Sequence, residues 1–143
     1  MSIRIKPFES ADLNRIEDLI ALYEQLGYPS TKEELTKRLQ DISKHNDYTL
    51  LLLFANERII GFVGLCEMLF FEKNGKYMRL LAFVIHSDSR RKGYGKKLLK
   101  ASENYALKRD CVALTMNSGK RDERSGSHHF YLDNGYEMKS LGF

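Results

Sequence analysis

Cysteine, proline and long apolar runs are all scarce in this chain of 143 residues. Its two cysteines, Cys66 and Cys111, lie far apart, which excludes the paired spacing of a zinc site and the density of a secreted disulfide scaffold. We therefore expect two reduced thiols. The longest apolar runs fall far short of the roughly 20 residues of a membrane span, and the amino terminus lacks the apolar core of a signal peptide. These absences predict a cytoplasmic protein with no membrane partner.

The composition is typical of a soluble globular protein. Hydrophobic residues make up 43% and charged residues 29% of the sequence, which has two prolines, no low-complexity tract and no internal repeat. A chain of this length can bury roughly 70% of the surface that its unfolded form exposes, so we expect a single domain over residues 1–143. The formal net charge of +4 and the pI of about 9.0 suit an anionic ligand or nucleic acid. The cations are enriched locally at residues 90–100.

The amino-terminal part of the chain predicts a short strand and then a helix. Apolar and polar residues alternate over residues 3–7, which is typical of a strand. Residues 10–26 carry an apolar stripe at helical spacing, with Ser10 as a possible cap and Gly27 as the end of the helix.

A second helix and a three-stranded meander follow. Ser30 and Glu33 have the spacing of a capping box, and an apolar stripe continues until the helix should end near His45. Short turns then separate three strand-like segments, which predicts antiparallel pairing. These strands are expected at residues 48–55, 59–71 and 77–85.

The third of these strands leads into a glycine loop, and a helix should open at Gly95. A further strand over residues 111–116 completes a strand, helix, strand crossover, which places the two strands parallel. A ligand can bind where the carboxyl ends of such strands meet the amino terminus of the helix. The rest of the chain predicts a polar loop over residues 117–126, a short helix over residues 127–133 and a final strand over residues 136–143.

The loop itself combines backbone donors with positive charge. It reads Arg-Arg-Lys-Gly-Tyr-Gly from Arg90 to Gly95 and continues into Lys96 and Lys97. Glycine lets the backbone approach a ligand closely, and the first turn of a helix offers unpaired N–H groups and the positive end of its dipole. This arrangement predicts a site for phosphate groups.

The spacing separates three kinds of glycine loop. A P-loop needs four residues between its first glycine and a Gly-Lys-Ser/Thr, which the segment around Gly93 and Gly95 does not have. A dinucleotide-binding fingerprint needs a third glycine where Leu98 stands, together with a later acidic residue for the ribose. The third possibility is the pattern Arg-x-x-Gly-x-Gly, which begins at Arg90.

Through this pattern the chain resembles the GNAT superfamily of N-acetyltransferases, which bind acetyl coenzyme A. A second similarity lies in the segment His-His-Phe-Tyr-Leu-Asp-Asn-Gly-Tyr over residues 128–136, which is similar to the Phe-Tyr-x-x-x-Gly-Phe/Tyr segment of that family. The order of predicted elements also agrees over nearly the whole chain. The resemblance implies an α/β (α+β) fold with a mixed central sheet. In it, an antiparallel amino-terminal meander precedes a parallel strand pair that splays at the cofactor site, and about four helices flank the sheet.

The resemblance also implies how acetyl-CoA would bind. Because the strand before the loop splays from its neighbour, the backbone groups of Phe83, Val84 and Ile85 would be free for the pantetheine arm and the thioester. Asn117 would also reach that arm. The loop would surround the pyrophosphate with backbone N–H groups, and its side chains would add screened attraction. These loop residues are Arg90, Arg91, Lys92, Gly93, Tyr94, Gly95 and Lys96.

For the chemistry, the resemblance implies that Tyr131 protonates the departing thiolate, since a tyrosine hydroxyl has a pKa near that of a thiol. A general base is less evident, because Arg79 stands where many relatives carry a glutamate. We predict Glu67 on the preceding strand as the base, with Glu72 or an ordered water as rivals. Without the resemblance, Tyr131 would be read as a core aromatic. The alternative for Glu67 is a solvent-facing side chain on an amphipathic strand.

The remaining residues support narrower expectations. His128 and His129 are adjacent and have no third ligand at a suitable spacing, so we expect no metal site. Four aromatic residues could line the acceptor pocket or belong to the core: Tyr23, Tyr28, Phe70 and Phe71.

The leading hypothesis is transfer of an acetyl group to a primary amine of a small molecule, such as an amino acid or an amino sugar, by direct attack in a ternary complex. The alternatives are a protein N-terminal or lysine acetyltransferase, a non-catalytic coenzyme A sensor and a basic nucleic-acid-binding module, of which the last lacks a recognition helix or aromatic residues within a basic surface. We expect no nucleic acid partner. The closing strand could pair with its counterpart in a second copy of the chain, so a homodimer is a further expectation left open.

Overall fold

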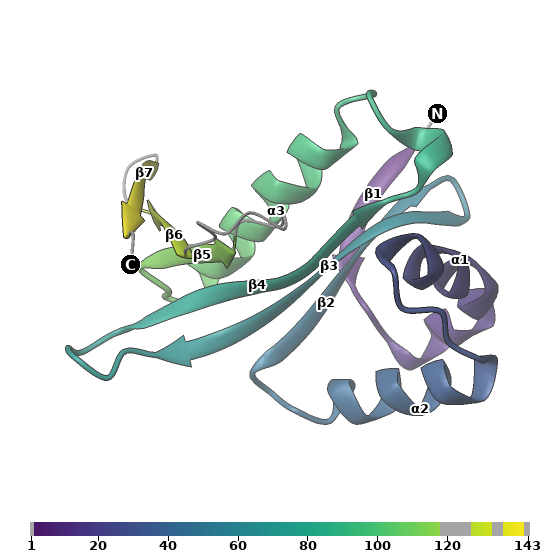
Figure 1. Ribbon diagram of the computed structural model, residues 1–143, viewed down its shortest axis with the longest axis horizontal. Helices are drawn as coiled ribbons and strands as arrows, with labels where there is room; N and C mark the ends of the chain where they lie inside the picture. The colour runs from purple at the N-terminus through teal and green to yellow at the C-terminus, as the bar shows by residue number, and fades with distance from the viewer. Residues whose placement is uncertain (1, 118–126, 133–135, 142–143) are drawn as a thin grey trace.

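The computed structural model describes residues 2–117, 127–132 and 136–141. Within these residues a single seven-stranded sheet runs in sequence order from β1 to β7 (Figure 1). Its strands are β1 (Ile3–Pro7), β2 (Tyr48–Ala55), β3 (Arg58–Leu69), β4 (Lys76–Ile85), β5 (Ala113–Asn117), β6 (Ser127–Leu132) and β7 (Tyr136–Leu141).

The sheet is mixed, as the sequence predicts. Strands β1 to β4 form an antiparallel meander, β4 and β5 pair in parallel, and β5 to β7 are antiparallel again. The parallel pair results from the crossover through helix α3 (Tyr94–Lys108). The predicted α/β fold with its antiparallel meander and parallel strand pair is thus confirmed.

Helices cover both faces of the sheet (Figure 1). Helix α3 lies on one face, while α1 (Ile16–Leu26) and α2 (Lys32–Ser43) lie together on the other. Alternating apolar side chains of β2 therefore enter two cores. Leu51 and Leu53 pack in the core beneath α3, whereas Leu50 and Leu52 pack in the core beneath α1 and α2. No helix among the described residues is long and apolar enough to span a membrane.

The two amino-terminal helices differ from the prediction in their first turns. Residues Ser10–Arg15 form a 3-10 helix whose cap is Glu9, and the α-helix starts only at Ile16. Helix α2 does have a capping box, but it joins Thr31 to Glu34, one residue later than predicted. Gly27 ends α1 with a φ of 106°, in agreement with its predicted role.

The prediction of a short helix over residues 127–133 is wrong for residues 127–132, so the described part of the chain has one α-helix fewer than the predicted count of about four. Residues 127–132 form strand β6, and the described residues contain three α-helices. The segment Ser-His-His-Phe-Tyr-Leu is rich in aromatic side chains, which favour strands. Pairing with β5 also satisfies backbone groups that would otherwise leave β5 as an open edge. Residues 118–126 of the predicted loop and residues 133–135 lie outside the described part of the chain.

Candidate active site

The segment between β4 and α3 is held in its shape by a side chain and by two residues with positive φ. The Arg90 Nε donates a hydrogen bond to the Ile85 carbonyl oxygen at 2.9 Å, which ties the loop to the end of β4. Arg91 has a φ of 65° and Gly93 a φ of 81°. Positive φ is strained for arginine and unstrained for glycine, so the loop stores some strain at Arg91.

The amino terminus of α3 is arranged to receive an anion. Gly93 caps the helix without a side-chain hydrogen bond, and the first turn has no acidic residue. The N–H groups of that turn are therefore not satisfied by a capping side chain, and the positive end of the helix dipole is not neutralised locally. Lys96 and Lys97 add positive charge on the exposed side of the same turn. These features fit a phosphate group.

Strands β4 and β5 separate beside this helix end. They pair only from Met78 to Leu80 on β4, although β4 continues to Ile85. On β3, Leu65 pairs with Leu80 and the preceding residue, Gly64, pairs with Ala82. Leu81 is therefore an extra residue of β4 without a partner on β3. This β-bulge bends β4 where the gap opens. One backbone edge of β4 is therefore uncovered by any described strand after the bulge.

The pairing pattern shows which backbone groups lie on the open edge. Alternate residues of an antiparallel strand direct their backbone groups to the same neighbour. The His86 N–H donates to the Ile60 carbonyl at 2.7 Å, so the backbone of Val84 also faces β3. Phe83 and Ile85 face the opposite edge, where the Ile85 carbonyl already accepts the hydrogen bond from the loop.

Two adjoining hollows follow this open edge, and we call them together the cleft. One, of about 440 Å³, lies at the loop, and the other, of about 640 Å³, lies where β4 and β5 part. Leu26 and Phe83 line both, so the two hollows adjoin each other. Their size is in the range of small-molecule sites, about 300–1,000 Å³. The other lining residues are Gln25, Tyr28, Leu80, Leu81, Ala82, Val84, Ile85, Ser89, Arg90, Arg91, Tyr94, Gly95, Leu99 and Met116.

Most of the predicted cofactor residues come together at this cleft. Lys92 is exposed in the loop, and Tyr94 is buried at the start of α3, where it lines the first hollow. Asn117 is the last residue of β5, one position beyond the residue that pairs with Leu80. Its backbone therefore lies at the open end of the gap between β4 and β5.

The backbone of Tyr131 lies elsewhere. Tyr131 pairs with Ala113, at the start of β5, whereas the gap opens beyond Met116 at the other end of that strand. With a rise of about 3.4 Å per residue, three residues separate these positions by roughly 10 Å along the strand. The register alone does not bring Tyr131 to the open end of the gap.

Glu67 is engaged on the α3 side of the sheet. Val63 and Leu65 pack in the core beneath α3, and side chains alternate along β3, so Glu67 faces the same way. Its carboxylate accepts hydrogen bonds from the Lys76 Nζ at 2.9 Å and the Arg109 Nε at 2.6 Å. Burial raises the pKa of Glu67, but these two cations outweigh it and hold the pKa below its ordinary value. Glu67 is not among the described residues that line the cleft.

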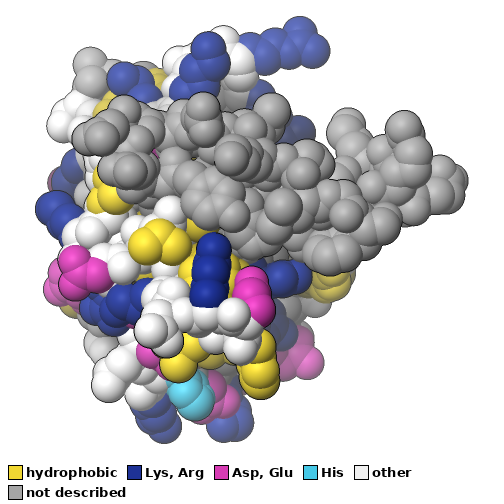
Figure 2. All heavy atoms as spheres, turned by 90° about the vertical axis from the view of Figure 1, so that its left-hand side faces the viewer, with side chains coloured by type: hydrophobic (Ala, Val, Ile, Leu, Met, Phe, Trp, Pro, Cys, Tyr) yellow, Lys and Arg dark blue, Asp and Glu magenta, His cyan; other side chains and the backbone are white. Residues whose placement is uncertain are grey.

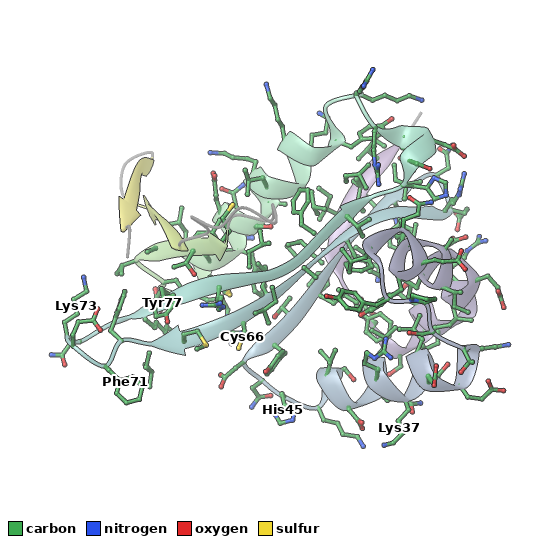
Figure 3. All side chains as sticks on the ribbon, viewed as in Figure 1. Lys37, His45, Cys66, Phe71, Lys73 and Tyr77 are labelled. Carbon is green, nitrogen blue, oxygen red and sulfur yellow. The ribbon has the colours of Figure 1, made fainter. Side chains whose placement is uncertain are left out.

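Of the four aromatic residues considered for an acceptor pocket, Tyr28 lines the cleft. Tyr23 packs against Phe62 in the core, with ring centroids 5.2 Å apart. Phe70 packs against Tyr77 in the hairpin of β3 and β4, and Phe71 is fully exposed at its tip (Figure 3). Three of the four thus lie outside the cleft.

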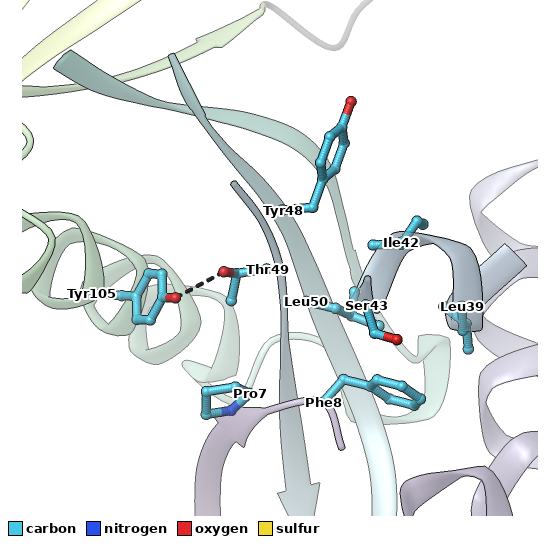
Figure 4. Close-up of a pocket in the computed structure, with 9 residues that line it drawn as sticks. All are labelled: Pro7, Phe8, Leu39, Ile42, Ser43, Tyr48, Thr49, Leu50 and Tyr105. Atoms are coloured by element: carbon cyan, nitrogen blue, oxygen red, sulfur yellow. Dashed lines mark hydrogen bonds between the residues drawn. The ribbon is translucent and has the colours of Figure 1, made fainter. Parts of the chain in front are cut away.

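A further hollow of about 120 Å³ lies between the end of α2 and α3 at the edge of β2 (Figure 4). The hydroxyl groups of Thr49 and Tyr105 form a hydrogen bond of 2.8 Å beside it. This hollow is smaller than the about 300 Å³ that a small-molecule site usually needs. We therefore assign the site to the cleft.

Neither a metal cluster among the described residues nor a uniformly basic surface on the described part of the hairpin end competes with this assignment. The described residues hold no group of three or more metal-binding side chains. The backbones of His128 and His129 lie in β6, and their side chains lie outside the described part. On the described part of the hairpin end, Lys and Arg side chains are interspersed with acidic and hydrophobic ones (Figure 2).

Sequence reasoning missed six apolar residues of the cleft, namely Leu26, Leu80, Leu81, Ala82, Leu99 and Met116. A signal existed for Leu81, because the apolar run from residue 80 to residue 85 breaks strict alternation and such a break can mark a bulge. Leu99 and Met116 follow ordinary core patterns. Only the separation of β4 from β5 makes them part of a cleft.

Comparisons with known proteins agree with this geometry. A family model described as the acetyltransferase (GNAT) family matches residues 13–136. A crystal structure of a GNAT family acetyltransferase from Staphylococcus aureus subsp. aureus USA300_TCH1516 is 50% identical, with a TM-score of 0.82. That match covers 86% of this chain and 91% of the other.

Two other relatives are more distant. The uncharacterized N-acetyltransferase YhdJ of Bacillus subtilis (strain 168) is 29% identical over 112 residues, which are 78% of this chain and 77% of that protein. The crystal structure of glucosamine-6-phosphate N-acetyltransferase from Arabidopsis thaliana has a TM-score of 0.70 at 21% identity and covers 81% of this chain and 82% of that one. At this identity the likeness shows the fold alone.

Proposed function

The chain belongs to the acetyltransferase (GNAT) family and is an acetyl-CoA-dependent acetyltransferase. From this premise, we propose that it transfers the acetyl group to a primary amine of a small molecule. The observation that carries the proposal is the open backbone edge at Phe83 beside a helix amino terminus without acidic residues. The cleft between them is of the size that a small molecule fills.

The residues present fit acetyl-CoA. The first turn of α3 and the loop from Arg91 to Lys96 would hold the pyrophosphate through backbone N–H groups. Phe83 would hold the pantetheine arm or the thioester through its backbone, and Asn117 would contact the same arm. Arg90 would act indirectly, because its hydrogen bond to Ile85 shapes the loop.

When bound, acetyl-CoA supplies an activated acetyl carbon: the amine nitrogen forms a bond to it, the bond to sulfur breaks, and sulfur leaves as the thiolate. We propose that Tyr131 gives its hydroxyl proton to that thiolate, on the support of the Phe-Tyr segment. The attacking nitrogen gives its proton to Glu67 or to water. The two ion pairs of Glu67 and its lowered pKa weigh in favour of water.

Direct attack in a ternary complex also fits the cysteines. Burial raises the pKa of Cys111 to about 11 and also raises the pKa of Cys66. Both thiols are buried and therefore remain protonated and poorly reactive near neutral pH. An acetylated cysteine intermediate would need a thiolate.

Acetyl-CoA binding is tested by thermal unfolding. Saturating ligand at about 100 times its Kd should stabilise the wild type by about 2.7 kcal/mol. The Gly93→Ala variant should lose most of this stabilisation, because its φ of 81° is strained for alanine. Gly75→Ala is the matched control, since Gly75 also has a positive φ, of 115°, but lies in the hairpin turn. Unchanged melting of the wild type with saturating acetyl-CoA would contradict the proposal.

The role of Tyr131 needs a separate measurement. Tyr131→Phe should keep the stabilisation by acetyl-CoA and lose turnover by about 10²-fold or more, as expected for a general acid. Release of free thiol measures turnover across amino acids, amino sugars, polyamines, aminoglycosides and peptides. Full turnover in the variant would show that another group protonates the thiolate.

The same panel separates the alternatives. Turnover only with peptides would favour a protein N-terminal or lysine acetyltransferase, and binding without turnover would favour a coenzyme A sensor. A nucleic-acid-binding module would show an affinity that falls steeply with salt. One domain over residues 1–143, a place in the cytoplasm and a homodimer remain parts of the proposal.

A further inference from the structure

Arg79 is a cation without an ion-pair partner among the described residues, and it lies on the side of the sheet opposite α3. Along β4, Met78 packs in the core beneath α3, and side chains alternate, so Arg79 points to the other face. It is half-buried. Among the described residues it has no salt bridge and no side-chain hydrogen bond, in contrast to Glu67 with its two cations.

The register places Arg79 in a row across the sheet. Tyr48 pairs with Cys66, Cys66 with Arg79, and Arg79 with Thr115. Residues directly opposite one another share a face of a sheet. Tyr48 lies on the face of α1 and α2 because Leu50, two residues on, packs beneath those helices. The row therefore lies on the face of α1 and α2.

Helices α1 and α2 do not cover this row. The residues that pack beneath them lie farther along the strands, and Tyr48 is 42% exposed. Figure 3 shows Cys66 on the side of the sheet where α2 lies, beyond the end of that helix and near His45. Among the described residues, Asp47 and Glu67 are the acidic groups that act on the Cys66 thiol together with Arg79, and Glu67 faces the other side of the sheet. Asp47 is exposed and forms no salt bridge with Arg79.

Arg79 is also close to the cleft. Two residues along β4 lies Leu81, the bulged residue that lines the larger hollow. This separation is about 7 Å along the strand. Tyr28 and Leu81 both line the larger hollow and are both exposed. An acceptor whose amine enters the cleft can thus extend its other end over Arg79.

A half-buried guanidinium without a carboxylate loses hydration and gains no ion pair in return, which destabilises the folded chain. A ligand that supplies an anion would form the missing ion pair and offset this loss of hydration. Arginine suits this task because its planar fork matches a carboxylate or phosphate through two parallel hydrogen bonds.

On the basis of the proposed acetyltransferase function, we propose that Arg79 binds an anionic group, a carboxylate or a phosphate, of the amine that is acetylated. Arg79 thereby selects acceptors that carry a negative charge next to the reacting amine. Arg79 makes no contact with the acetyl group in this assignment. It determines specificity and leaves the cofactor loop unchanged.

Matched acceptor pairs test the proposal and separate the two sources of charge. Phenylalanine against phenethylamine isolates the carboxylate, and glucosamine 6-phosphate against glucosamine isolates the phosphate. In wild type we expect the anionic member of at least one pair to have a kcat/KM at least 10-fold higher. Arg79→Met keeps the length of the side chain and removes its charge, so it should abolish that preference by raising the KM of the anionic acceptor.

Lys37→Met is the matched control, because Lys37 is an exposed cation on the outer side of α2 (Figure 3). It should keep the preference. Stabilisation by acetyl-CoA should be unchanged in Arg79→Met, and its melting temperature without ligand should equal or exceed that of the wild type. A merely structural role for Arg79 would instead lower that temperature.

A binding measurement removes the dependence on turnover. With coenzyme A at saturation, the anionic member of the favoured pair should raise the melting temperature of the wild type more than its uncharged partner does. In Arg79→Met the two members should raise the melting temperature equally. Equal shifts for both members of both pairs, or a preference that survives in Arg79→Met, would overturn the role of Arg79. The proposed function fails separately, if acetyl-CoA itself gives no stabilisation.

Discussion

Single residues set the backbone geometry on which the cleft depends. Gly61 of β3 pairs with Ile85, the last residue of β4, at the loop end of the sheet. A Cβ atom there would be 2.9 Å from the Val84 carbonyl oxygen and 2.8 Å from the Ile85 Cδ1. Glycine is needed at this position because a neighbouring backbone occupies the space of a side chain.

Gly61→Ala should therefore destabilise the protein by about 1–3 kcal/mol, since the overpacked strands must shift. It should also weaken acetyl-CoA binding, because Val84 and Ile85 flank the open backbone edge of the cleft. Chemical denaturation and thermal shift with ligand measure the two effects. Gly64→Ala is the control: its Cβ would lie 3.7 Å from the Ala82 Cβ, an ordinary contact. Equal losses in both variants would contradict the steric explanation.

At the scale of elements, local sequence signals determine where α2 begins. The Thr31 Oγ1 accepts a hydrogen bond from the Glu34 N–H at 3.1 Å, and the Glu34 carboxylate accepts one from the Thr31 N–H at 2.9 Å. Ser30 has the same chemistry as Thr31, but its hydroxyl bonds to the Tyr28 carbonyl and the Arg38 guanidinium. The capping box is therefore formed one residue later than the sequence predicts.

Thr31→Ala should cost about 1 kcal/mol, the usual effect of removing a helix cap. The measurement is the free energy of unfolding in urea. Thr31→Ser keeps the hydroxyl group and should retain most of the stability. A loss in Thr31→Ser as large as in Thr31→Ala would mean that the methyl group, rather than the cap, is responsible.

At the scale of the whole molecule, Glu67 links three separate elements. Its carboxylate joins β3 to Lys76 at the start of β4 and to Arg109 just after α3. Arg109 also donates to the Asn46 carbonyl oxygen before β2. This network lies at the end of the sheet where β4 and β5 are still paired, so we infer that it fixes the closed end of their divergence.

Glu67→Gln should lower the urea midpoint at pH 7, because both cations lose their anion. The pKa of Glu67 is lowered on folding, so its contribution is complete above the ordinary value of 4.5 and is lost as the pH falls through the lower folded-state pKa. The difference between wild type and variant should therefore shrink between pH 5 and about pH 3. Unfolding curves at pH 7, 5 and 3 check this, with Glu72→Gln as an exposed control.

The same variant separates the two roles of Glu67. If Glu67 acts as the linking group, turnover with saturating substrates should change little at pH 7. If it acts as the general base, turnover should fall by about 10²-fold or more while stability changes less. The two outcomes are distinguished by measuring thiol release and unfolding on the same samples.

The sequence predicted the elements whose signals are local. Strand β2 has the predicted bounds, because a short, mostly apolar run between turns is typical of a buried strand and too short for most helices. The glycine loop was also predicted from a local signal, because Arg90, Gly93 and Gly95 follow one another at a fixed spacing. Residues 127–132 were predicted as a helix and form a strand, because aromatic residues suit both and pairing with β5 decides between them.

By itself, then, the sequence determined the mixed sheet, the helix after the loop and the family, since periodicity and short motifs depend on neighbours along the chain. Tertiary structure alone decided the bulge at Leu81, the ion pairs of Glu67 and the position of Arg79 away from every described carboxylate that could pair with it. These depend on strand register, which brings residues far apart in sequence to one face of the sheet. A shift of one residue in that register would move every side chain to the other face.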